Sequence, residues 1–211
     1  MTARTLAESL ATRKVVLASA NRGKLNELET LLAPLGLTLE TLAQHHVDSP
    51  EETGLTFVEN ALIKARNASH ATGLPSLADD SGLAVTALAG APGIYSARYA
   101  GESASDAENV TRLLDELHHL APGSRGASFH ACVVFMRHAR DPAPLICHGV
   151  WRGWILDAPR GEGGFGYDPV FAAPEFGDRA AAELTAAEKN GVSHRGKALR
   201  ALIDALQSTD A

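Results

Sequence analysis

The segment Ala78-Asp79-Asp80-Ser81-Gly82 carries two adjacent carboxylates at the end of an apolar run that begins at Leu74. A carboxylate that directly follows a strand is held by the strand and exposed by the turn, which suits proton transfer or metal binding. Asp is disfavoured inside strands, so the pair indicates either an ordinary Asp-Ser-Gly turn or a site. Other segments are needed to distinguish the two.

A second segment, Ser19-Ala20-Asn21-Arg22-Gly23-Lys24, lies where a strand-like run meets a helix-like run. Such a turn directs backbone N–H groups and the positive end of the helix at one point. Arg22 and Lys24 oppose that helix dipole at a cost of a few tenths of a kcal/mol each, roughly, unless an anion lies there. The spacing is not that of a Walker A loop. The segment therefore predicts phosphate binding in preference to a solvated helix start.

A second acidic pair, Glu51-Glu52, precedes a helix-like run that starts near Thr56. Alone, these acids are favourable partners of a helix dipole. Together with Asp79 and Asp80 they make an oxygen-rich set suited to Mg²⁺, which takes one or two carboxylates with waters and substrate phosphates. Because adjacent residues of an extended chain point to opposite sides, we expect one member of each pair to face the metal and the other to have a structural role.

Residues 161–169 combine four glycines with Phe165 and Tyr167. This density indicates close backbone approach or positive φ, and the aromatic rings offer a stacking surface for a base; the alternative is a surface loop with a buried Phe. Lys189 and Ser193-His194-Arg195 place cations near a helix start, which again indicates a polar ligand. Residues 90–101 form a long irregular loop, for which a ligand contact and a dimer contact both remain open.

The elements around these segments follow a mixed α/β pattern. Capping-box spacing occurs at Ser105/Glu108 and Thr185/Glu188. Apolar periodicity predicts helices over 21–35, 56–72, 105–120 and 193–206, and strands over 14–19, 74–78, 83–88, 129–135 and 145–156. The strand over 129–135 is predicted to be half-buried, and the strand over 145–156 to be its antiparallel partner. Strands alternating with helices, with one long hairpin, predict a mixed β-sheet flanked by helices.

Composition limits the function classes. A chain of 211 residues makes one domain or one compact two-lobed unit. A net charge of −6 without a basic cluster argues against a broad nucleic-acid surface but allows a small polyanionic ligand. No apolar run approaches the ~20 residues of a membrane span, and residues 1–13 lack the apolar core of a secretory signal. We expect these 13 residues to be an N-terminal extension and the location of the protein to be cytoplasmic. We also expect Cys132 and Cys147 to be buried free thiols; the alternative is that they face each other across the hairpin.

Taken together, six segments resemble the inosine triphosphate pyrophosphatase family, most closely its bacterial branch, from Lys14 to about Leu206. Ser19 stands where Thr is common in that family, and a few extra residues precede Lys14. The resemblance is carried by Ser19-x-Asn21-x-x-Lys24, residues 51–61, residues 78–83, residues 93–101, residues 164–169 and Ser193-His194-Arg195.

The resemblance implies hydrolysis of a nucleoside triphosphate between the α- and β-phosphates. The preferred substrates would be ITP, dITP, XTP and dXTP, and the products the monophosphate and pyrophosphate. It also implies Mg²⁺, a homodimer without nucleic-acid or membrane partners, and an elongated two-lobed α/β fold, residues 14–211 forming one domain with the active-site cleft between its lobes.

By position, the resemblance assigns roles to individual residues. Residues 19–24 would bind the triphosphate, Asp80 would be proton acceptor and metal ligand, and Glu51 would help to hold Mg²⁺. Substrate contacts are implied for Ser81, Phe165, Gly166, Tyr167, Asp168, Lys189, His194 and Arg195.

Base selection has a physical explanation, which we offer as a hypothesis. Hypoxanthine and xanthine present a 6-keto acceptor, whereas adenine presents an amino donor. Donors such as Lys189, Arg195 or backbone N–H groups of the glycine-rich segment would pair with the keto group and be left unpaired against adenine.

Two other hypotheses compete with this one. A covalent aspartyl-phosphate enzyme of the Asp-x-Asp type needs its acids one residue apart, whereas Asp79 and Asp80 are adjacent. A non-catalytic purine nucleotide-binding regulator predicts loss of the acidic set, yet Glu51 and Asp80 are both present.

Overall fold

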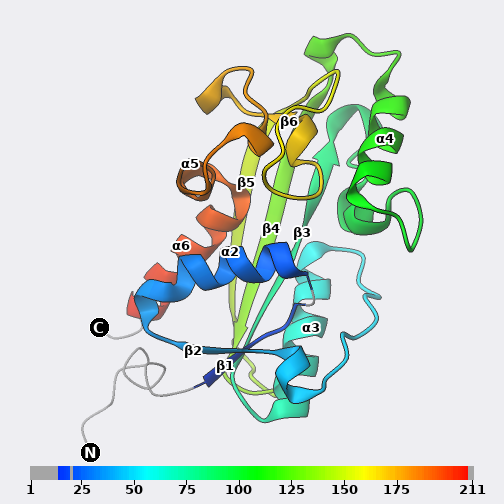
Figure 1. The fold of residues 1–211 in the computed structure, drawn as a ribbon. Helices are drawn as coiled ribbons and strands as arrows, with labels where there is room; N and C mark the ends of the chain where they lie inside the picture. Colours follow the sequence, from blue (N-terminus) through cyan, green and yellow to red (C-terminus); the bar gives the residue numbers. More distant parts are fainter. Residues whose placement is uncertain (1–13, 20, 209–211) are drawn as a thin grey trace, which may run out of the picture. The chain divides into compact units, whose positions relative to one another are not determined.

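The computed structural model describes residues 14–19 and 21–208 (Figure 1). The predicted N-terminal extension, residues 1–13, and Ala20 lie outside the described residues. The strands are β1 (Lys14–Leu17), β2 (Thr38–Thr41), β3 (Ser76–Val85), β4 (Gly126–Met136), β5 (Leu145–Ile155) and β6 (Phe171–Ala172). The helices are α2 (Arg22–Leu32), α3 (Phe57–Thr72), α4 (Asp106–Leu117), α5 (Ala186–Val192) and α6 (His194–Ser208), and short 3₁₀ helices occupy several connections.

The strands form one mixed sheet in the order β2-β1-β3-β4-β5-β6. β1 runs parallel to β2 and β3, and β5 runs antiparallel to β6. The α/β class with a mixed sheet flanked by helices is therefore confirmed. The predicted helix starts are also confirmed, because the side chains of Thr56, Ser105 and Thr185 each accept a hydrogen bond from the backbone N–H three residues later.

The described chain divides into two compact units. The first takes the residues up to Asp80, residues 131–149 and those from Arg195 on, and the second takes residues 81–130 and 150–194. Strands β3, β4 and β5 contribute to both units.

In the first unit, side chains of β1, β3 and β4 alternate between two apolar clusters. One cluster packs against α2 and α6, on one face of the strands (Figure 1), and its members include Val15, Leu17, Leu28, Leu77, Val133, Phe135 and Leu199. The other packs against α3, with members that include Val16, Ala61, Ala65, Ala78, Cys132 and Val134. Both faces of β4 are thus buried here, so the half-buried strand predicted over 129–135 is wrong for residues 131–135, because helices cover both faces.

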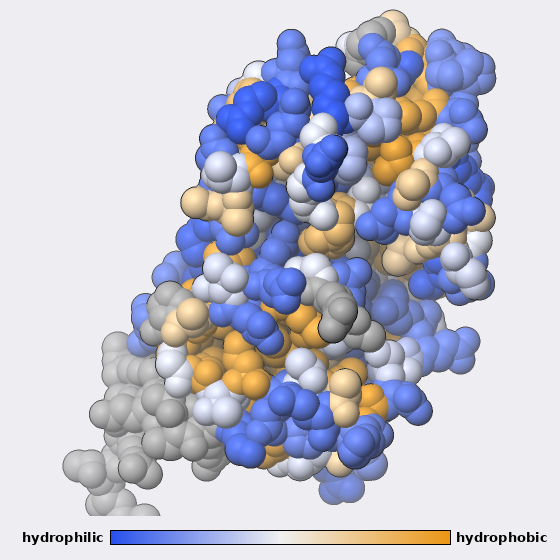
Figure 2. Space-filling model, in the orientation of Figure 1, coloured by the Kyte–Doolittle hydropathy of each residue, from blue (hydrophilic) through white to orange (hydrophobic). Residues whose placement is uncertain are grey.

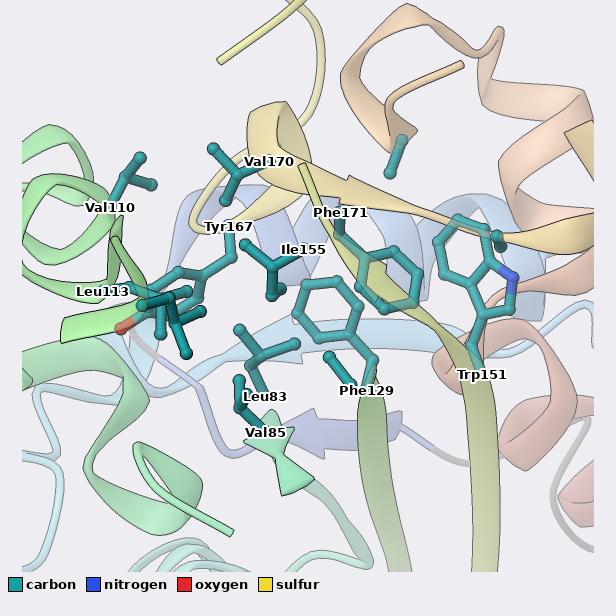
Figure 3. Close-up of a cluster of buried hydrophobic side chains, with 14 residues drawn as sticks. Leu83, Val85, Val110, Leu113, Phe129, Trp151, Ile155, Tyr167, Val170 and Phe171 are labelled. Carbon is teal, nitrogen blue, oxygen red and sulfur yellow. The ribbon is translucent and has the colours of Figure 1, made fainter. Parts of the chain in front are cut away.

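The second unit has its own core, drawn in Figure 3. The ring centroids of Phe129 and Phe171 lie 4.7 Å apart, and those of Trp151 and Phe171 lie 5.0 Å apart. Leu113 of α4 and Tyr167 of the glycine-rich segment are buried in the same cluster. This core therefore fixes the glycine-rich segment at Tyr167.

Both cysteines are buried and free, as predicted. Cys147 belongs to the cluster under α2 and α6, and Cys132 to the cluster under α3. Burial raises the pKa of the Cys132 thiol to about 12. A thiol with such a pKa carries little thiolate at neutral pH and is chemically unreactive.

The surface is predominantly hydrophilic on the face shown in Figure 2, with apolar residues gathered in two areas, one in the region of α2 and β2 and one at the upper right. Partly buried leucines that pack against the core of the first unit come from this region: Leu25, Leu31, Leu35, Leu37 and Leu39. Among the described residues, no helix has the length and apolar character needed to cross a membrane.

The connection between β4 and β5 is organised by Asp141, whose side chain is buried. Its carboxylate accepts hydrogen bonds from the Arg137 side chain, at 2.8 and 2.5 Å, and from the backbone N–H groups of Arg137 and Ala143, both at 3.0 Å. The Arg137 side chain, followed by these backbone donors, holds the pKa of Asp141 well below its usual range.

We predict that Asp141→Asn lowers the free energy of unfolding by about 1.5 kcal/mol at neutral pH, because an amide cannot accept all of these bonds. The difference from wild type should be complete above pH ~4, where an unfolded Asp is ionised, and should shrink as the pH falls towards the folded pKa. Urea unfolding at several pH values measures it. The exposed Asp204→Asn is the matched control, and equal effects of the two substitutions would contradict the role of Asp141.

Candidate active site

Asp79 and Asp80 lie inside a strand and not in a turn. β3 continues from Ser76 to Val85 without interruption, and Asp79 and Asp80 are only 1% and 5% exposed. The expectation of two short strands separated by an exposed turn is therefore wrong. Buried cations compensate the two carboxylates, which overcomes the usual exclusion of Asp from strand interiors.

The alternation of β3 sends the two carboxylates to opposite faces. Leu77 packs under α2 and α6, and Ala78 packs under α3. By the two-residue period of a strand, Asp79 shares the face of Leu77, and Asp80 shares that of Ala78. Their ion pairs agree, since Asp79 contacts Lys24 of α2 and Arg195 of α6, whereas Asp80 contacts Lys64 of α3. The predicted division of the acidic pair between two sides is confirmed in the structure.

Asp79 is held between the half-buried Lys24 and the buried Arg195. Its Oδ2 lies 3.2 Å from Lys24 Nζ and 3.3 Å from Arg195 Nη2, and the other terminal nitrogen of Arg195, Nη1, binds Glu27. Burial lowers the pKa of Lys24, although Asp79 counteracts this. Burial also acts to lower the pKa of Arg195, but Asp79 and Glu27 outweigh it, and the pKa of Arg195 is raised. Asp79 therefore serves as the counter-charge that keeps these side chains inside the first unit.

Asp80 has a different environment. Its Oδ1 accepts a hydrogen bond of 2.7 Å from Lys64 Nζ, which also lies 3.3 Å from Glu52 Oε1. Its Oδ2 is buried and accepts no hydrogen bond from the part of the chain that the structure describes. Burial raises the pKa of Asp80, against the opposing effect of Lys64 and Lys24. The buried Oδ2 can accept a proton or coordinate a cation.

At the predicted turn between β1 and α2, helix α2 begins next to Asn21, where the sequence predicted a helix start. Asn21 caps α2 by accepting a hydrogen bond of 3.0 Å from the Lys24 N–H, and its own N–H donates to Ser19 Oγ at 3.2 Å. No acidic residue occupies the first turn of α2. Ala20 and the side chain of Arg22 lie outside the described residues.

The structure qualifies one argument for phosphate binding at this turn. We expected Lys24 to need an anion because it opposes the dipole of α2. Asp79 already supplies that anion. The position of Lys24 is therefore explained without a phosphate, and phosphate binding rests on the cap geometry and on the resemblance.

The two members of the Glu51-Glu52 pair differ in burial. Glu51 is exposed, whereas Glu52 is half-buried and pairs with Lys64. The segment is tied to the start of α3, because the Gly54 N–H donates to Asn60 Oδ1 at 2.8 Å. A Cβ on Gly54 would lie 2.6 Å from the Glu59 Cβ, so only glycine permits this approach.

The glycine-rich segment joins Lys189 in the second unit. Asp168, buried at 2% exposure, accepts hydrogen bonds from the Phe165 N–H at 2.9 Å and from Lys189 Nζ at 2.6 Å. Lys189 Nζ lies 5.0 Å from the centroid of the Phe165 ring. Gly164 has a φ of +73°, and a Cβ there would lie 2.1 Å from Asp168 Oδ2. The structure thus brings three predicted site residues, Phe165, Asp168 and Lys189, into one cluster.

The remaining predicted residues have separate surroundings. The Tyr167 side chain is part of the second unit's core, and its hydroxyl donates to the Ser96 carbonyl at 2.9 Å. The His194 ring stacks on Phe129 at 4.8 Å with an angle of 10° between the planes. Ser81 is half-buried within β3. Arg195, which we expected near the base, has its guanidinium against Asp79 and Glu27 in the first unit.

Sequence reasoning missed the role of Lys64. Lys64 lies in the helix predicted over 56–72, on the same buried side as Ala61 and Ala65. A charged side chain at a position that faces the core was the available signal, because buried lysines are paired when they occur. Glu27 gave no comparable signal, since an acid on an amphipathic helix is usually solvated.

Within the described residues, no group of three or more His, Cys, Asp and Glu side chains is arranged to hold a metal ion. The donor set nevertheless fits Mg²⁺, which prefers one or two carboxylates completed by waters and phosphate oxygens. The Asp80 Oδ2 is one such carboxylate oxygen.

Comparison with known proteins relates the whole described chain to one family. A family model described as the Ham1 family matches residues 15–205. The chain is 57% identical over 196 residues to a dITP/XTP pyrophosphatase of Pectobacterium atrosepticum, an alignment that covers 93% of this chain and 99% of that protein. It is 56% identical over 196 residues to a dITP/XTP pyrophosphatase of Shigella flexneri, with the same coverage.

Solved structures agree with this result. A HAM1 protein from Coxiella burnetii superimposes with a TM-score of 0.86 and 51% sequence identity, covering 93% of this chain and 100% of that chain. The Ham1 protein of Staphylococcus aureus gives a TM-score of 0.82 at 37% identity, covering 93% and 99%.

We predict that Asp79→Asn and Asp80→Asn differ sharply in stability. Asp79→Asn leaves the buried Arg195 and the half-buried Lys24 with less compensation and should lower the free energy of unfolding by about 3 kcal/mol. Asp80→Asn should cost less, because Lys64 keeps Glu52 as a partner and burial already disfavours the charge of Asp80. Urea unfolding of the two isosteric variants without nucleotide measures both values. Equal losses would show that Asp79 is not the principal counter-charge.

Proposed function

Since this chain belongs to the Ham1 family, we propose that it hydrolyses non-canonical purine nucleoside triphosphates, namely ITP, dITP, XTP and dXTP. The products are the nucleoside monophosphate and pyrophosphate. The proposal is supported by relatives that are named dITP/XTP pyrophosphatase and match this chain almost end to end. We propose that the protein removes these nucleotides from the nucleotide pool and that it acts in the cytoplasm as a homodimer.

The observation that carries the proposal is the environment of Asp80. One carboxylate oxygen is fixed by Lys64, and the other is buried without a hydrogen bond from the described chain. Burial raises the pKa of this carboxylate towards the range in which a general base is most effective. A rigid strand holds it, so little reorganisation is needed during the reaction.

In the proposed reaction, Asp80 accepts a proton from the attacking water as a new P–O bond forms. The anhydride linkage between the α- and β-phosphorus atoms breaks, and pyrophosphate leaves with the electron pair of the bridging oxygen. The phosphate oxygens gain negative charge, which nearby cations stabilise. Lys24 and Lys64 are the ammonium groups that the first unit holds beside the two aspartates.

Asp80 and Glu51 would hold Mg²⁺, which when bound neutralises phosphate charge. Residues 19–24 would bind the triphosphate through the backbone N–H groups at the start of α2, around the Asn21 cap. The Asp80 side chain alone supplies the base in this scheme.

The purine base would be recognised by residues of the second unit. Phe165 supplies a ring for stacking, and Lys189 supplies ammonium donors beside it. A 6-keto oxygen accepts from such donors, whereas the 6-amino group of adenine leaves them unpaired. Ser81, Gly166, Tyr167, Asp168, His194 and Arg195 are the further substrate-contact residues in this proposal. Of these residues, Arg195 would contact the substrate through a part of its side chain other than the nitrogens that pair with Asp79 and Glu27, so we do not assign it as the donor for the 6-keto group.

We predict that the wild-type protein with Mg²⁺ releases pyrophosphate from ITP and has little activity on ATP. Product identification by ³¹P NMR separates the possible reactions, because pyrophosphate and orthophosphate have distinct resonances. Orthophosphate as the first product would rule out the proposed pyrophosphatase activity. Tight ITP binding without any product would favour a nucleotide-binding regulator.

We predict that Asp80→Asn lowers kcat for ITP by about 10²–10⁴-fold, because the amide cannot accept the proton. Nucleotide binding, measured by calorimetry, should change much less. The exposed Asp204→Asn serves as the control for loss of one carboxylate. Near wild-type turnover by Asp80→Asn would remove Asp80 from the role of base.

A further inference from the structure

Asp106, the first residue of α4, reaches across to the glycine-rich segment. Its Oδ2 accepts a hydrogen bond of 2.7 Å from the Gly166 N–H, a residue 60 positions further along the chain. Both residues belong to the second unit. Sequence reasoning gave Asp106 no role, because an acid in the first turn of a helix is ordinarily a partner of the helix dipole.

The segment that Asp106 contacts has an unusual backbone. Gly164 and Gly166 both have positive φ, at +73° and +62°. Glycine moves readily between such conformations and their alternatives, so the glycines alone do not hold this shape. Hydrogen bonds hold it instead, from the Phe165 N–H to Asp168 at 2.9 Å and from the Gly163 N–H to the Ala182 carbonyl at 3.1 Å.

Packing gives the segment little support on the side of α4. A hollow of about 510 Å³ lies there, and its lining includes Val110, Leu114, Pro159, Phe165 and Gly166. Side chains that border an open hollow lack the dense contacts that fix atoms in a protein interior. The hydrogen bond to Asp106 therefore matters more for the position of Gly166 than it would in a packed loop.

Helix capping does not account for Asp106. The start of α4 has its own complete capping box, in which Ser105 and Glu108 each bond the backbone of the other. A structural role limited to the helix dipole would also not require the carboxylate to reach Gly166.

We propose that Asp106 is a positioning residue that holds Gly166, and through it Phe165, in place for the purine base. This inference rests on the proposed function and adds to it a residue that sets how well the base is bound and discriminated. Asp106 acts through the backbone of the glycine-rich segment and does not itself need to touch the substrate.

Three variants test the role. Asp106→Ala removes the acceptor, whereas Asp106→Asn keeps an acceptor oxygen and removes the charge that interacts with the helix dipole. Asp115→Ala is the matched control, because Asp115 is an exposed acid of the same helix that lines the same hollow. For each, kcat and KM are measured with ITP and with ATP, and amide hydrogen exchange is followed for the peptide that contains Gly166.

Asp106→Ala should raise KM for ITP about five- to tenfold and leave kcat within about twofold, as expected for lost binding at a point remote from the reacting phosphates. The preference for ITP over ATP in kcat/KM should fall by a similar factor. Exchange at Gly166 should accelerate in Asp106→Ala, and Asp106→Asn should restore the wild-type values of all three quantities.

The other outcomes overturn the role. If Asp106→Ala behaves like Asp115→Ala, the hydrogen bond does not position the segment. If Asn and Ala variants lose activity equally with normal exchange at Gly166, the effect is one of charge on the helix. If the wild-type protein releases no pyrophosphate from ITP, the proposed function fails and the role in base binding fails with it, whereas hydrogen exchange still reports whether the tether exists.

Discussion

The first unit depends on the burial of two adjacent carboxylates in the middle of β3. A buried charge is costly unless an opposite charge and hydrogen bonds accompany it. Because neighbouring strand residues point to opposite faces, each carboxylate needs its own cations, supplied by helices on opposite faces of the strand. Lys24 and Arg195 come to Asp79 from α2 and α6, and Lys64 comes to Asp80 from α3. The positions of these three helices therefore determine which cation meets which carboxylate.

The same constraint separates the two aspartates by role. Asp79 is neutralised by two cations and stabilises the assembly that surrounds it. Asp80 has one oxygen bound and the other buried without a hydrogen bond from the described chain, which is an incomplete arrangement in a folded interior. Buried polar atoms left without partners are concentrated at functional sites, where a ligand or a reacting group completes them. The difference in counter-charge, with two cations at Asp79 Oδ2 and Lys64 at Asp80 Oδ1, supports Asp80 as the chemical group of the pair.

The second unit uses a buried carboxylate in a similar way. Asp168 binds the Phe165 backbone and the Lys189 ammonium, so a single side chain fixes both the stacking ring and the cation near it. Gly164 makes this possible, because any side chain there would collide with the carboxylate. Asp106 then holds the far side of the same segment. The glycine-rich segment is therefore shaped by two carboxylates together with the glycine that lets its backbone approach one of them.

The sequence by itself determined the longer helices, most of the strands, the helix caps and the motifs that relate the chain to its family, because these depend on local periodicity, on side-chain-to-backbone bonds and on residue order. It did not predict the short strands β2 and β6. It misjudged β3, since Asp in a strand is unfavourable until distant cations compensate it. It assigned Arg195 to the base and overlooked Lys64, because the local sequence does not show which partner, 16 or 116 positions away, a charged side chain meets. Only the tertiary structure decided which cation meets which carboxylate, since that choice depends on which helix covers which face of the strand.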